Sequence, residues 1–489
     1  MVRVAVIGGG PAGYEAALVA RQLGAEATII ERDGLGGACV LTDCVPSKTL
    51  IASSDAMTNA AAARTLGIRY LRAIGDEPLA DLDGDGVPDI RPETVTVDIP
   101  TVFARVKALA LAQSLDVAAR LGREGVSVVQ GTARLLDTRR IAVRRAHGAE
   151  TGAIAPANDD ETIVEADVIL LATGAHPRVV PGAEPDGERI LNWRQVYDLP
   201  ELPQRLVVVG SGATGAEFAG AFQALGSSVT LVSSRDRVLP GEDADAANLI
   251  EDVFTRRGMT VVKSVRASAV ERTAEGVVVK LDDGRAIEGT HALMTVGSLP
   301  STQELGLDAA GIALDERGYI PVDRVSRTSV PGIYAAGDCT GVMMLASVAA
   351  MQGRIAMWHA LGDAVAPLRL NTVAGTVFTD PEIATVGVNE AEIQAGSVYS
   401  DVIKLPLATN ARAKMQGITD GFVKLFCRPE SGKVLGGVVV APGASELILP
   451  ISMAVQNGLN ADHVAHTFSI YPSLSGSLTE AARQLMPRH

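Results

Sequence analysis

The sequence predicts an α/β protein built from two doubly wound, Rossmann-like domains and a smaller C-terminal α+β domain. Three observations lead to this fold class. The chain has 489 residues, which is too long for a single hydrophobic core. Glycine-rich segments at 8–13 and 210–215 each stand between a strand-like apolar run and a helix-like run, as in a βαβ unit. From residue 369 onward, alternating apolar runs indicate an antiparallel sheet with helices.

The composition disfavours several classes of protein. Hydrophobic residues make up 47% and charged residues 20%, which is typical of a globular protein. The formal net charge of −14 disfavours nucleic acid as a partner, because phosphate binding needs a basic face. No apolar run approaches the roughly 18 residues that cross a bilayer, and residues 2–7 are typical of a strand rather than of a signal peptide. We therefore expect a cytoplasmic protein with no membrane insertion.

The first glycine-rich segment predicts a dinucleotide site. Residues 2–7 form the expected first strand, a helical pattern runs from Tyr14 to Leu23, and a second strand ends at an acid. The glycines let the backbone approach a pyrophosphate at the helix N-terminus, and the acid accepts a hydrogen bond from a ribose hydroxyl. The residues of this fingerprint are Gly8, Gly10, Gly13 and Glu31.

The same unit recurs at residues 205–237, which implies a second dinucleotide and excludes a simple single-site dehydrogenase. The strand Leu206–Val209 is followed by G-S-G-A-T-G, a helix and the strand V-T-L-V. No acid stands at the end of that strand, where Ser233, Ser234 and Arg235 follow one another. An acid there favours NADH and an arginine favours the 2′-phosphate of NADPH, so we favour NADPH, while solvated surface charges stay an alternative.

Two of the four cysteines, Cys39 and Cys44, lie in the stretch G-G-A-C-V-L-T-D-C-V-P-S-K. In a reducing compartment such close cysteines are more often catalytic or metal-binding than structural. We predict no metal site, because no second ligand cluster stands near Cys339 or Cys427.

Two polar stretches are interpreted as solvated loops. Residues 74–93 contain D-L-D-G-D-G, which resembles the start of a calcium loop, but Pro92 stands where that loop needs a glutamate. Residues 145–162 form the second loop, and 361–368 are expected to be a linker.

Together these motifs resemble the flavoprotein disulfide reductases, the group of dihydrolipoamide dehydrogenase, glutathione reductase and mercuric reductase. The resemblance runs from residue 2 to about residue 486. Its further motifs are A-T-G at 172–174, T-V-G at 295–297, Y-A-A-G-D at 334–338 and V-F-T-D-P-E at 377–382. It implies FAD on the first unit, NADPH or NADH on the second, and a homodimer. The implied domains are 1–172 and 295–368 for FAD, 173–294 for NAD(P)H and 369–489 for dimerisation.

The resemblance also implies roles for single residues. Cys39 and Cys44 correspond to the redox pair, with Cys44 against the flavin and Cys39 attacking the substrate, and Lys48 sits near the flavin, paired with Glu217. Glu31 would hold the adenosine ribose, and Asp338 the ribityl and phosphate region. The implied FAD-binding residues are Gly8, Gly10, Pro11, Ala12, Gly13, Glu31, Arg32, Gly37, Ala38, Lys48, Gly131, Thr132, Ala133, Ala172, Thr173, Gly174, Gly337, Asp338, Leu345, Ala346 and Ser347. The implied NAD(P)H-binding residues are Gly210, Gly212, Thr214, Gly215, Glu217, Ser233, Ser234, Arg235, Val296 and Gly297.

One motif of the family is broken in this chain. Disulfide reductases of this group carry H-P-x-x-x-E near the C-terminus, and the histidine, from the other subunit, shuttles a proton to the substrate. Here Tyr471 takes the histidine position and Gly476 the glutamate position. A positioned general acid–base contributes about 10²–10⁴ in rate, and a tyrosine with a pKa of about 10 accepts protons poorly at neutral pH. Asp43, directly before Cys44, also disfavours a thiolate.

We therefore expect an FAD-dependent NAD(P)H oxidoreductase whose acceptor is a quinone, with Tyr471 in the acceptor site. The stretch Y-P-S-L-S-G-S resembles the lipoamide-dehydrogenase-like quinone reductases that lack the dyad. The presence of both cysteines weighs against this reading. A disulfide reductase of the dihydrolipoamide dehydrogenase type, using Cys39–Cys44, and a flavin-bound redox sensor with little turnover stay open. A mercuric-reductase-like enzyme is disfavoured because the chain ends without a cysteine pair.

Overall fold

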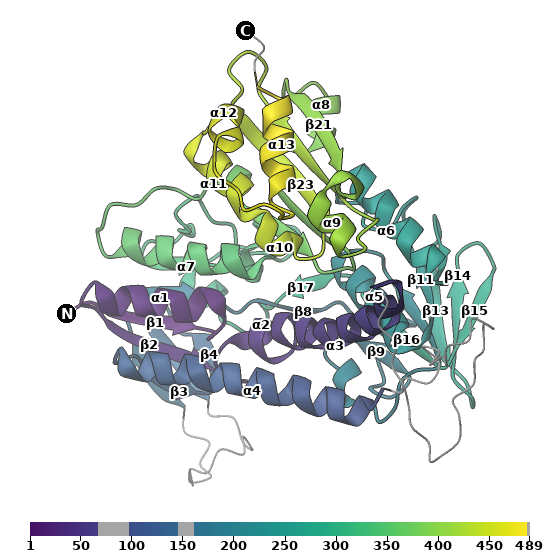
Figure 1. The fold of residues 1–489 in the computed structure, drawn as a ribbon. Helices are drawn as coiled ribbons and strands as arrows, with labels where there is room; N and C mark the ends of the chain where they lie inside the picture. The colour runs from purple at the N-terminus through teal and green to yellow at the C-terminus, as the bar shows by residue number, and fades with distance from the viewer. Residues whose placement is uncertain (67–96, 145–160, 487–489) are drawn as a thin grey trace, which may run out of the picture. The chain divides into compact units, whose positions relative to one another are not determined.

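The fold is that of a computed structural model, which describes residues 1–66, 97–144 and 161–486 (Figure 1). The expected acidic loop at 74–93 and residues 145–160 of the second polar loop lie outside the described residues. The chain divides into two compact units. Unit 1 comprises Met1–Ser47, Ala104–Arg178 and Gly297–Leu370, and unit 2 comprises Lys48–Phe103, Val179–Val296 and Asn371–His489.

Unit 1 is built on a parallel sheet with the strand order β18-β7-β1-β2-β3. These strands are β1 (Arg3–Ile7), β2 (Glu26–Glu31), β3 (Ser127–Gln130), β7 (Val168–Leu171) and β18 (Ile333–Ala335). Two small antiparallel sheets accompany it. One is made of β4 (Thr132–Leu135), β5 (Arg140–Arg144) and β6 (Thr162–Glu165), and the other of β8 (Ala175–Pro177) and β17 (Ser298–Pro300).

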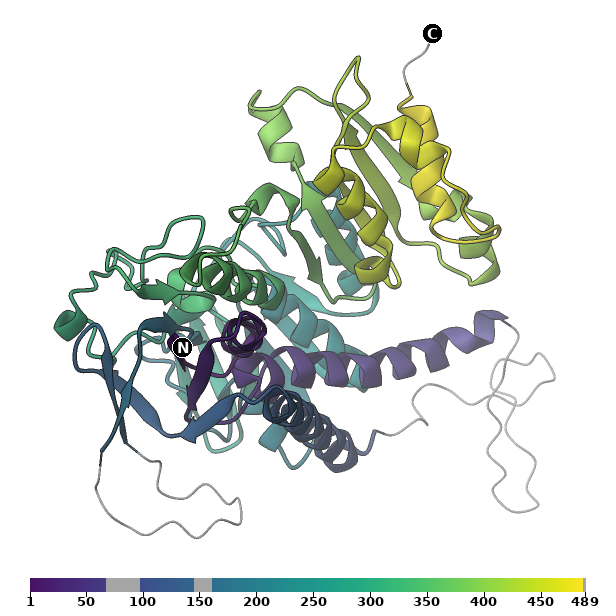
Figure 2. The same cartoon turned by 90° about the vertical axis from the view of Figure 1, so that its left-hand side faces the viewer.

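Helices α1 (Pro11–Gln22) and α7 (Ala346–Ala360) cross closely beside this sheet, as the purple and green helices of Figure 2 show. A Cβ built on Gly353 would lie 2.1 Å from the carbonyl oxygen of Ala12, so this crossing requires a glycine. The apolar sides of both helices and of strands β1, β2 and β7 form one core. Helix α1 begins at Pro11, three residues before the predicted start at Tyr14, because proline suits the first helical position.

Unit 2 contains a second parallel sheet, with the order β12-β11-β10-β16-β9. Its strands are β9 (Ile190–Asn192), β10 (Arg205–Val209), β11 (Ser228–Val232), β12 (Thr260–Val262) and β16 (His291–Met294). The accompanying helices are α5 (Ala213–Leu225), α6 (Ala244–Arg256) and the part of α3 (Cys44–Ala62) from Lys48 onward. An antiparallel sheet is formed by β13 (Ala267–Arg272), β14 (Val277–Leu281) and β15 (Ala286–Gly289). Helix α4 (Ile99–Arg123) begins in unit 2 and continues in unit 1.

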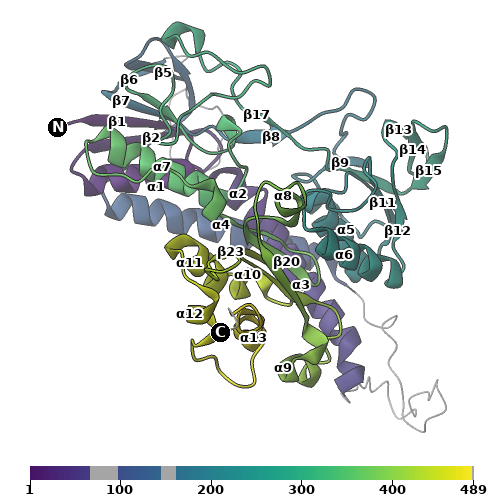
Figure 3. The same ribbon diagram turned by 90° about the horizontal axis from the view of Figure 1, so that it is seen from above.

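The C-terminal part of unit 2 is an antiparallel sheet with the order β19-β20-β23-β22-β21 (Figure 3). Its strands are β19 (Ala374–Val377), β20 (Glu382–Gly387), β21 (Asp401–Pro406), β22 (Phe422–Cys427) and β23 (Val434–Ala441). The helices are α8 (Glu390–Gln394), α9 (Ala411–Met415), α10 (Ala444–Leu447), α11 (Leu449–Asn457), α12 (Ala461–Ala465) and α13 (Gly476–Gln484). Together, the two parallel sheets and this α+β part confirm the predicted fold class. Within the described residues, we find no helix that combines the length and the apolar character of a membrane span.

Candidate dinucleotide and redox sites

The three glycines of the first fingerprint differ in how much room the surrounding chain leaves for a side chain. Gly8 has a φ of +105°, and a Cβ on it would lie 2.3 Å from the carbonyl oxygen of Ala172. A Cβ on Gly13 would lie 1.9 Å from the carbonyl oxygen of Gly8. Packing within the chain therefore requires both residues. On Gly10 the same Cβ would meet nothing closer than the Cα of Gly37 at 4.0 Å, among the described residues.

Gly10 is therefore explained by something that approaches from outside the chain. It precedes the first residue of α1, where no described side chain caps the helix and no acid stands in the first turn. The backbone N–H groups at such a helix start attract an anion, and a missing side chain lets a pyrophosphate come close. The residues present fit a dinucleotide.

Glu31 ends β2 and is fixed by the backbone around the fingerprint. Its Oε2 accepts a hydrogen bond from the Gly9 amide at 2.6 Å. Its Oε1 accepts from the amides of Asp33 at 2.6 Å and Gly34 at 3.1 Å. Because a carboxylate offers about four lone-pair positions, the buried carboxylate retains capacity for a ribose hydroxyl.

The other expected FAD residues of unit 1 gather at the carboxyl ends of its parallel strands, the edge where such sheets bind ligands. Ala172, Thr173 and Gly174 follow β7, and Gly337 and Asp338 follow β18. The flanking residues also lie at element ends. Gly37 opens α2 (Gly37–Leu41), where Ala38 lies, Gly131 precedes β4, and Leu345 precedes α7. Arg32 is exposed and pairs with Asp33 at 3.1 Å.

Motif reasoning missed one residue that shapes this edge. Gln352 of α7 is buried, and its side-chain oxygen accepts the Gly337 amide hydrogen bond at 2.9 Å. Gly337 has a φ of +81°, which favours glycine, so Gln352 holds the turn that leads into Asp338. No sequence spacing predicts this contact, because Gln352 lies 15 residues after Gly337 and belongs to none of the motifs.

Asp338 stands in a place that is unfavourable for a bare carboxylate. Burial, together with the nearby Asp43 carboxylate, raises its pKa to about 6. Asp43 therefore raises the pKa of Asp338, the acid expected to bind the ribityl chain, and it also directly precedes Cys44. Hydroxyl groups that donate hydrogen bonds would favour the ionised form of Asp338.

The two cysteines of the redox motif lie on neighbouring short elements. Cys39 is in α2, Cys44 is the first residue of α3, and both are half-buried. The amides of Thr42 and Asp43 donate to the carbonyl of Ala38 at 2.9 and 2.8 Å, which closes the turn between the two helices.

The other two cysteines are buried. Burial raises the pKa of Cys339 to about 11 and that of Cys427 to about 12. Both therefore stay protonated thiols near neutral pH, which makes them poor nucleophiles.

The second fingerprint, in unit 2, repeats the geometry of the first. A Cβ on Gly210 would lie 2.4 Å from the carbonyl oxygen of Thr295, and one on Gly215 would lie 1.9 Å from that of Gly210. On Gly212, which precedes α5, the same Cβ meets no described atom within 4 Å. Again the middle glycine is the one that packing within the described residues does not require.

The segment after β11 is held by Ser233, and the two residues that follow Ser233 are exposed. Ser233 is buried, and the Ser211 hydroxyl donates to its Oγ at 2.7 Å. Ser234 and Arg235 are exposed. Thr214 is half-buried in the first turn of α5, Val296 follows β16, and Gly297 falls in unit 1.

Lys48 and Glu217 form the ion pair that the resemblance implied. The Nζ of Lys48 lies 2.8 Å from Glu217 Oε2, and this carboxylate is 6% exposed. Glu217 Oε1 accepts the Phe378 amide at 2.9 Å, and Lys48 Nζ lies 4.8 Å from the centre of the Phe378 ring. Phe378 belongs to V-F-T-D-P-E, so a motif marked its position but not its contact with Lys48.

Tyr471 lies on the loop between α12 and α13 and is 85% exposed. Gly476 begins α13, and its amide donates to Ser473 Oγ at 3.2 Å. The histidines upstream are engaged around their own helix. His463 accepts the Asn460 amide at 3.1 Å, and His466 pairs with Asp462 at 3.1 Å.

The chain is similar to known proteins over nearly its whole length. The chain matches the pyridine nucleotide-disulphide oxidoreductase family over residues 2–353, and the dimerisation domain of that family over residues 373–482. A Mycobacterium tuberculosis (strain ATCC 25618 / H37Rv) protein named NAD(P)H dehydrogenase (quinone) is 54% identical over 489 residues, covering 99% of this chain and 94% of that one. Dihydrolipoyl dehydrogenase 2 of Haloarcula marismortui is 34% identical, covering 98% and 95%.

Solved structures give the same picture. The crystal structure of LpdA from Mycobacterium tuberculosis matches with a TM-score of 0.90 at 53% identity, covering 100% of both chains. The flavoprotein disulfide reductase RclA from Escherichia coli matches with a TM-score of 0.81 at 24% identity and covers 98% and 99%, which shows a shared fold.

Proposed function

Because the chain belongs to the pyridine nucleotide-disulphide oxidoreductase family, we propose that it passes electrons from NAD(P)H through FAD to a quinone. Members of the family use FAD and NAD(P)H, and this chain is a flavoprotein oxidoreductase. When bound, FAD supplies the redox chemistry by taking two electrons from NAD(P)H and giving them to the acceptor. The balance is NAD(P)H, one proton and a quinone going to NAD(P)⁺ and a hydroquinone.

The observation that carries the quinone proposal is the site of the missing dyad. Tyr471 and Gly476 hold the histidine and glutamate positions, and the two upstream histidines are engaged around α12. Reduction of a disulfide releases a thiolate that needs a proton from a positioned acid. A quinone has no such leaving group, and solvent supplies its second proton. The name of the 54% identical relative supports the same acceptor.

The residues of this chain have defined tasks in the proposal. The backbone around Gly10 would hold the pyrophosphate of FAD, while Glu31 would orient its ribose and Asp338 its ribityl chain. Glu217 and the Phe378 ring hold the Lys48 ammonium in one place. A fixed positive charge stabilises negative charge that develops on a redox ring.

We also propose NADPH as the preferred coenzyme. The exposed Ser234 and Arg235 stand where an acid would hold the ribose of NADH, and a guanidinium pairs well with a 2′-phosphate.

The domain boundaries of the sequence analysis, with breaks after residues 172, 294 and 368, remain part of the proposal. A homodimer is supported by the match to the dimerisation domain. Exposed apolar side chains are frequent in that domain, as expected of an interface. They include Leu449, Met453, Phe468, Ile470 and Tyr471.

The decisive test compares NADPH oxidation with menadione in the wild type and in Cys39→Ser. We expect the variant to keep its rate within about twofold, because electrons need not pass through a thiol. Lys48→Met is the matched control, and we expect it to lose rate with bound FAD unchanged. A collapse of the Cys39→Ser rate while FAD stays bound would show that the acceptor is reduced by the cysteine pair.

One observation favours a second candidate. The motif retains both Cys39 and Cys44, as a disulfide reductase requires. In that case lipoamide or another small disulfide would be reduced faster than menadione, and the activity would be lost in both Cys39→Ser and Cys44→Ser. Low turnover with every acceptor would instead favour the redox sensor.

A further inference from the structure

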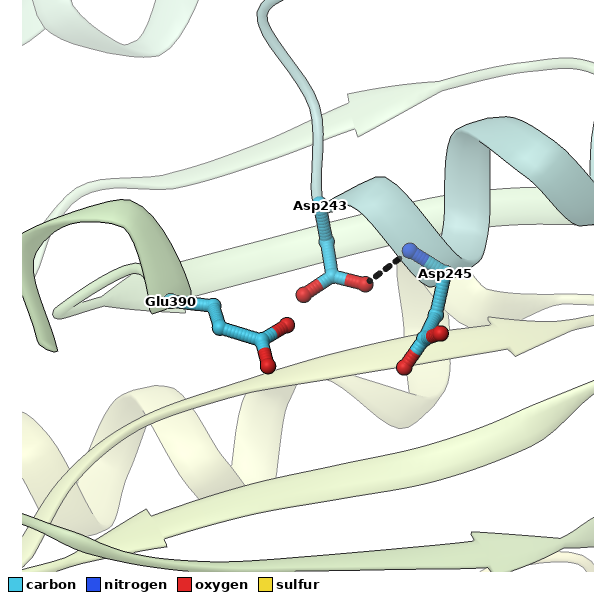
Figure 4. Close-up of side chains that lie close together, drawn as sticks. All are labelled: Asp243, Asp245 and Glu390. Carbon is cyan, nitrogen blue, oxygen red and sulfur yellow. Dashed lines mark hydrogen bonds between the residues drawn. The ribbon is translucent and has the colours of Figure 1, made fainter. Parts of the chain in front are cut away.

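A buried lysine occupies the centre of an acidic cluster in unit 2. Asp243, Asp245 and Glu390 bring carboxylate oxygens within 4.8 Å of one another, and Figure 4 shows Asp243 and Asp245 at the start of one helix with Glu390 facing them from another. Such a group is typical of a cation site. Here the cation is the ammonium of Lys424, which lies 2.8, 2.8 and 2.6 Å from these three carboxylates.

Lys424 belongs to β22, and its side chain is only 2% exposed. Burial alone would lower its pKa, but the hydrogen bonds that the ammonium donates to the three carboxylates raise this pKa well above its ordinary value. The ammonium is therefore permanently charged. Burying a charge is costly unless it is fully paired, so Lys424 fixes the relative positions of all three partners.

A second lysine adds another positive charge to this cluster. Lys404 of β21 stands directly opposite Lys424 in the sheet register and contacts Asp245 at 3.0 Å. Like charges in this relation repel each other. Asp245 lies within contact of both ammonium groups and offsets that repulsion, which ties the start of α6 to two strands of the C-terminal sheet.

The start of α6 is also the end of the proposed coenzyme loop. Asp243 caps α6 by accepting the amides of Asp245 at 3.0 Å and Ala246 at 3.2 Å, and Lys424 contacts both of its oxygens. The other end of the loop is held by the buried Ser233, which accepts the Arg235 amide at 3.1 Å. Residues 234–242 thus run between two anchors and are also held between them, where the buried Leu239 donates its amide to the Ser211 carbonyl at 2.8 Å and the Val238 amide donates to Glu251 of α6 at 3.4 Å.

We propose that Lys424 is a positioning residue for the coenzyme, because it anchors the end of the loop that carries Arg235. This inference rests on the proposed role of that loop in binding the 2′-phosphate of NADPH. A loop held along its length loses little freedom when a ligand binds, whereas releasing its end at Asp243 leaves part of the loop to be ordered at the cost of affinity. The C-terminal sheet thereby contributes to coenzyme binding through one side chain.

The test is Lys424→Met in the FAD-loaded protein, with Lys404→Met as the matched control. Methionine keeps the length of the side chain and removes its charge. We expect the Kd for NADP⁺ by calorimetry and the KM for NADPH to rise about tenfold, with kcat and bound FAD within about twofold. Amide hydrogen exchange of residues 234–242 should accelerate. Lys404→Met removes the more exposed contact with Asp245 and the contact with the Phe422 ring, and it should change each quantity less than about twofold.

A purely structural role has a different signature. If Lys424→Met lowers the thermal midpoint but leaves NADP⁺ affinity and the exchange of 234–242 unchanged at 25 °C, the proposal is wrong. Should that variant not fold, Glu390→Gln removes one partner while Asp243 and Asp245 stay, and the same changes are expected at smaller amplitude. Their absence in a folded Glu390→Gln protein would also overturn the proposal.

Failure of the coenzyme assignment itself is distinguishable. Arg235→Ala tests the loop directly and should weaken NADP⁺ binding about tenfold or more. If Arg235→Ala leaves binding unchanged, the proposed function of the loop fails, and the role of Lys424 in coenzyme binding fails with it. If Arg235→Ala weakens binding and Lys424→Met does not, only the positioning role is overturned.

Discussion

Single residues in the two fingerprints differ in what requires them. Gly13 and Gly215 have no room for a methyl group, because a Cβ on either would lie 1.9 Å from a carbonyl oxygen. Gly10 and Gly212 have room for one and adopt extended backbone angles that any residue accepts. The first pair therefore maintains the fold, and the second pair maintains the approach of a ligand.

This difference gives a matched pair of predictions for the coenzyme site. Gly212→Ala should leave the thermal midpoint and bound FAD unchanged and raise the Kd for NADP⁺ more than about tenfold, because the methyl group blocks a phosphate. Gly215→Ala should lower the thermal midpoint by several degrees, because backbone must shift to relieve the clash. Calorimetry and thermal unfolding of both variants distinguish the two effects. Equal losses of affinity without any change in stability would contradict this account.

At the scale of elements, helix α3 carries both a cysteine of the redox motif and charged residues that make ionic contacts. It begins with Cys44 and carries Lys48 one turn later. Two turns beyond Lys48, Asp55 lines a small cleft together with Glu217, Arg257 and Asp380. Burial, together with the carboxylates of Asp380 and Glu382 and against the opposing effect of Arg257, raises the pKa of Asp55 to about 6.

The raised pKa of Asp55 predicts a pH-dependent stability. The folded chain holds this proton more tightly than the unfolded chain, whose carboxyl has a pKa of about 4, so stability falls as the pH rises from about 4 through 6. Asp55→Asn removes the buried charge. Because the group is partly exposed, we expect a gain of only about 1 kcal/mol at pH 7.5 and almost none at pH 4.5.

The difference in thermal midpoint between Asp55→Asn and the wild type should therefore grow from pH 4.5 to pH 7.5, to about 2 °C. Asp98→Asn is a suitable control, because its carboxylate lies at the surface and has a lowered pKa from its hydrogen bonds to Thr101. A difference for Asp55→Asn that is the same at both pH values would refute the assignment.

At the scale of the whole molecule, the exposed apolar side chains of the C-terminal domain need a partner. Phe468 is fully exposed and Ile470 is 81% exposed on the loop that carries Tyr471. Phe468→Ser combined with Ile470→Ser should shift the protein from dimer toward monomer in sedimentation, since apolar burial drives association. Leu111→Ser removes a leucine of α4 that is 58% exposed and should leave the dimer intact. Loss of the dimer in the α4 variant alone would place the interface elsewhere.

Both βαβ units and their glycines followed from the sequence, because glycine spacing and strand periodicity are local properties. The start of α1 differed by three residues, since Pro11 extends the first turn. Lys424 could not be foreseen. In V-K-L-F-C, Lys424 looks like an ordinary polar residue of a strand. Its partner Asp243 lies 181 residues away in the sequence. The contacts of Gln352 and Asp55 could not be predicted for the same reason, because only the folded chain brings these residues to their neighbours.

The start of α13 has a consequence for the history of this scaffold. Gly476 has room for a side chain, since a Cβ on it would meet no atom of the described residues closer than the Ser473 hydroxyl at 3.8 Å, and the first turn of α13 holds no acid. A glutamate there would face the favourable end of the helix dipole. The backbone therefore does not enforce the loss of the dyad. On this framework, a quinone reductase and a disulfide reductase would differ by few mutations. The structure leaves room for these mutations in either direction.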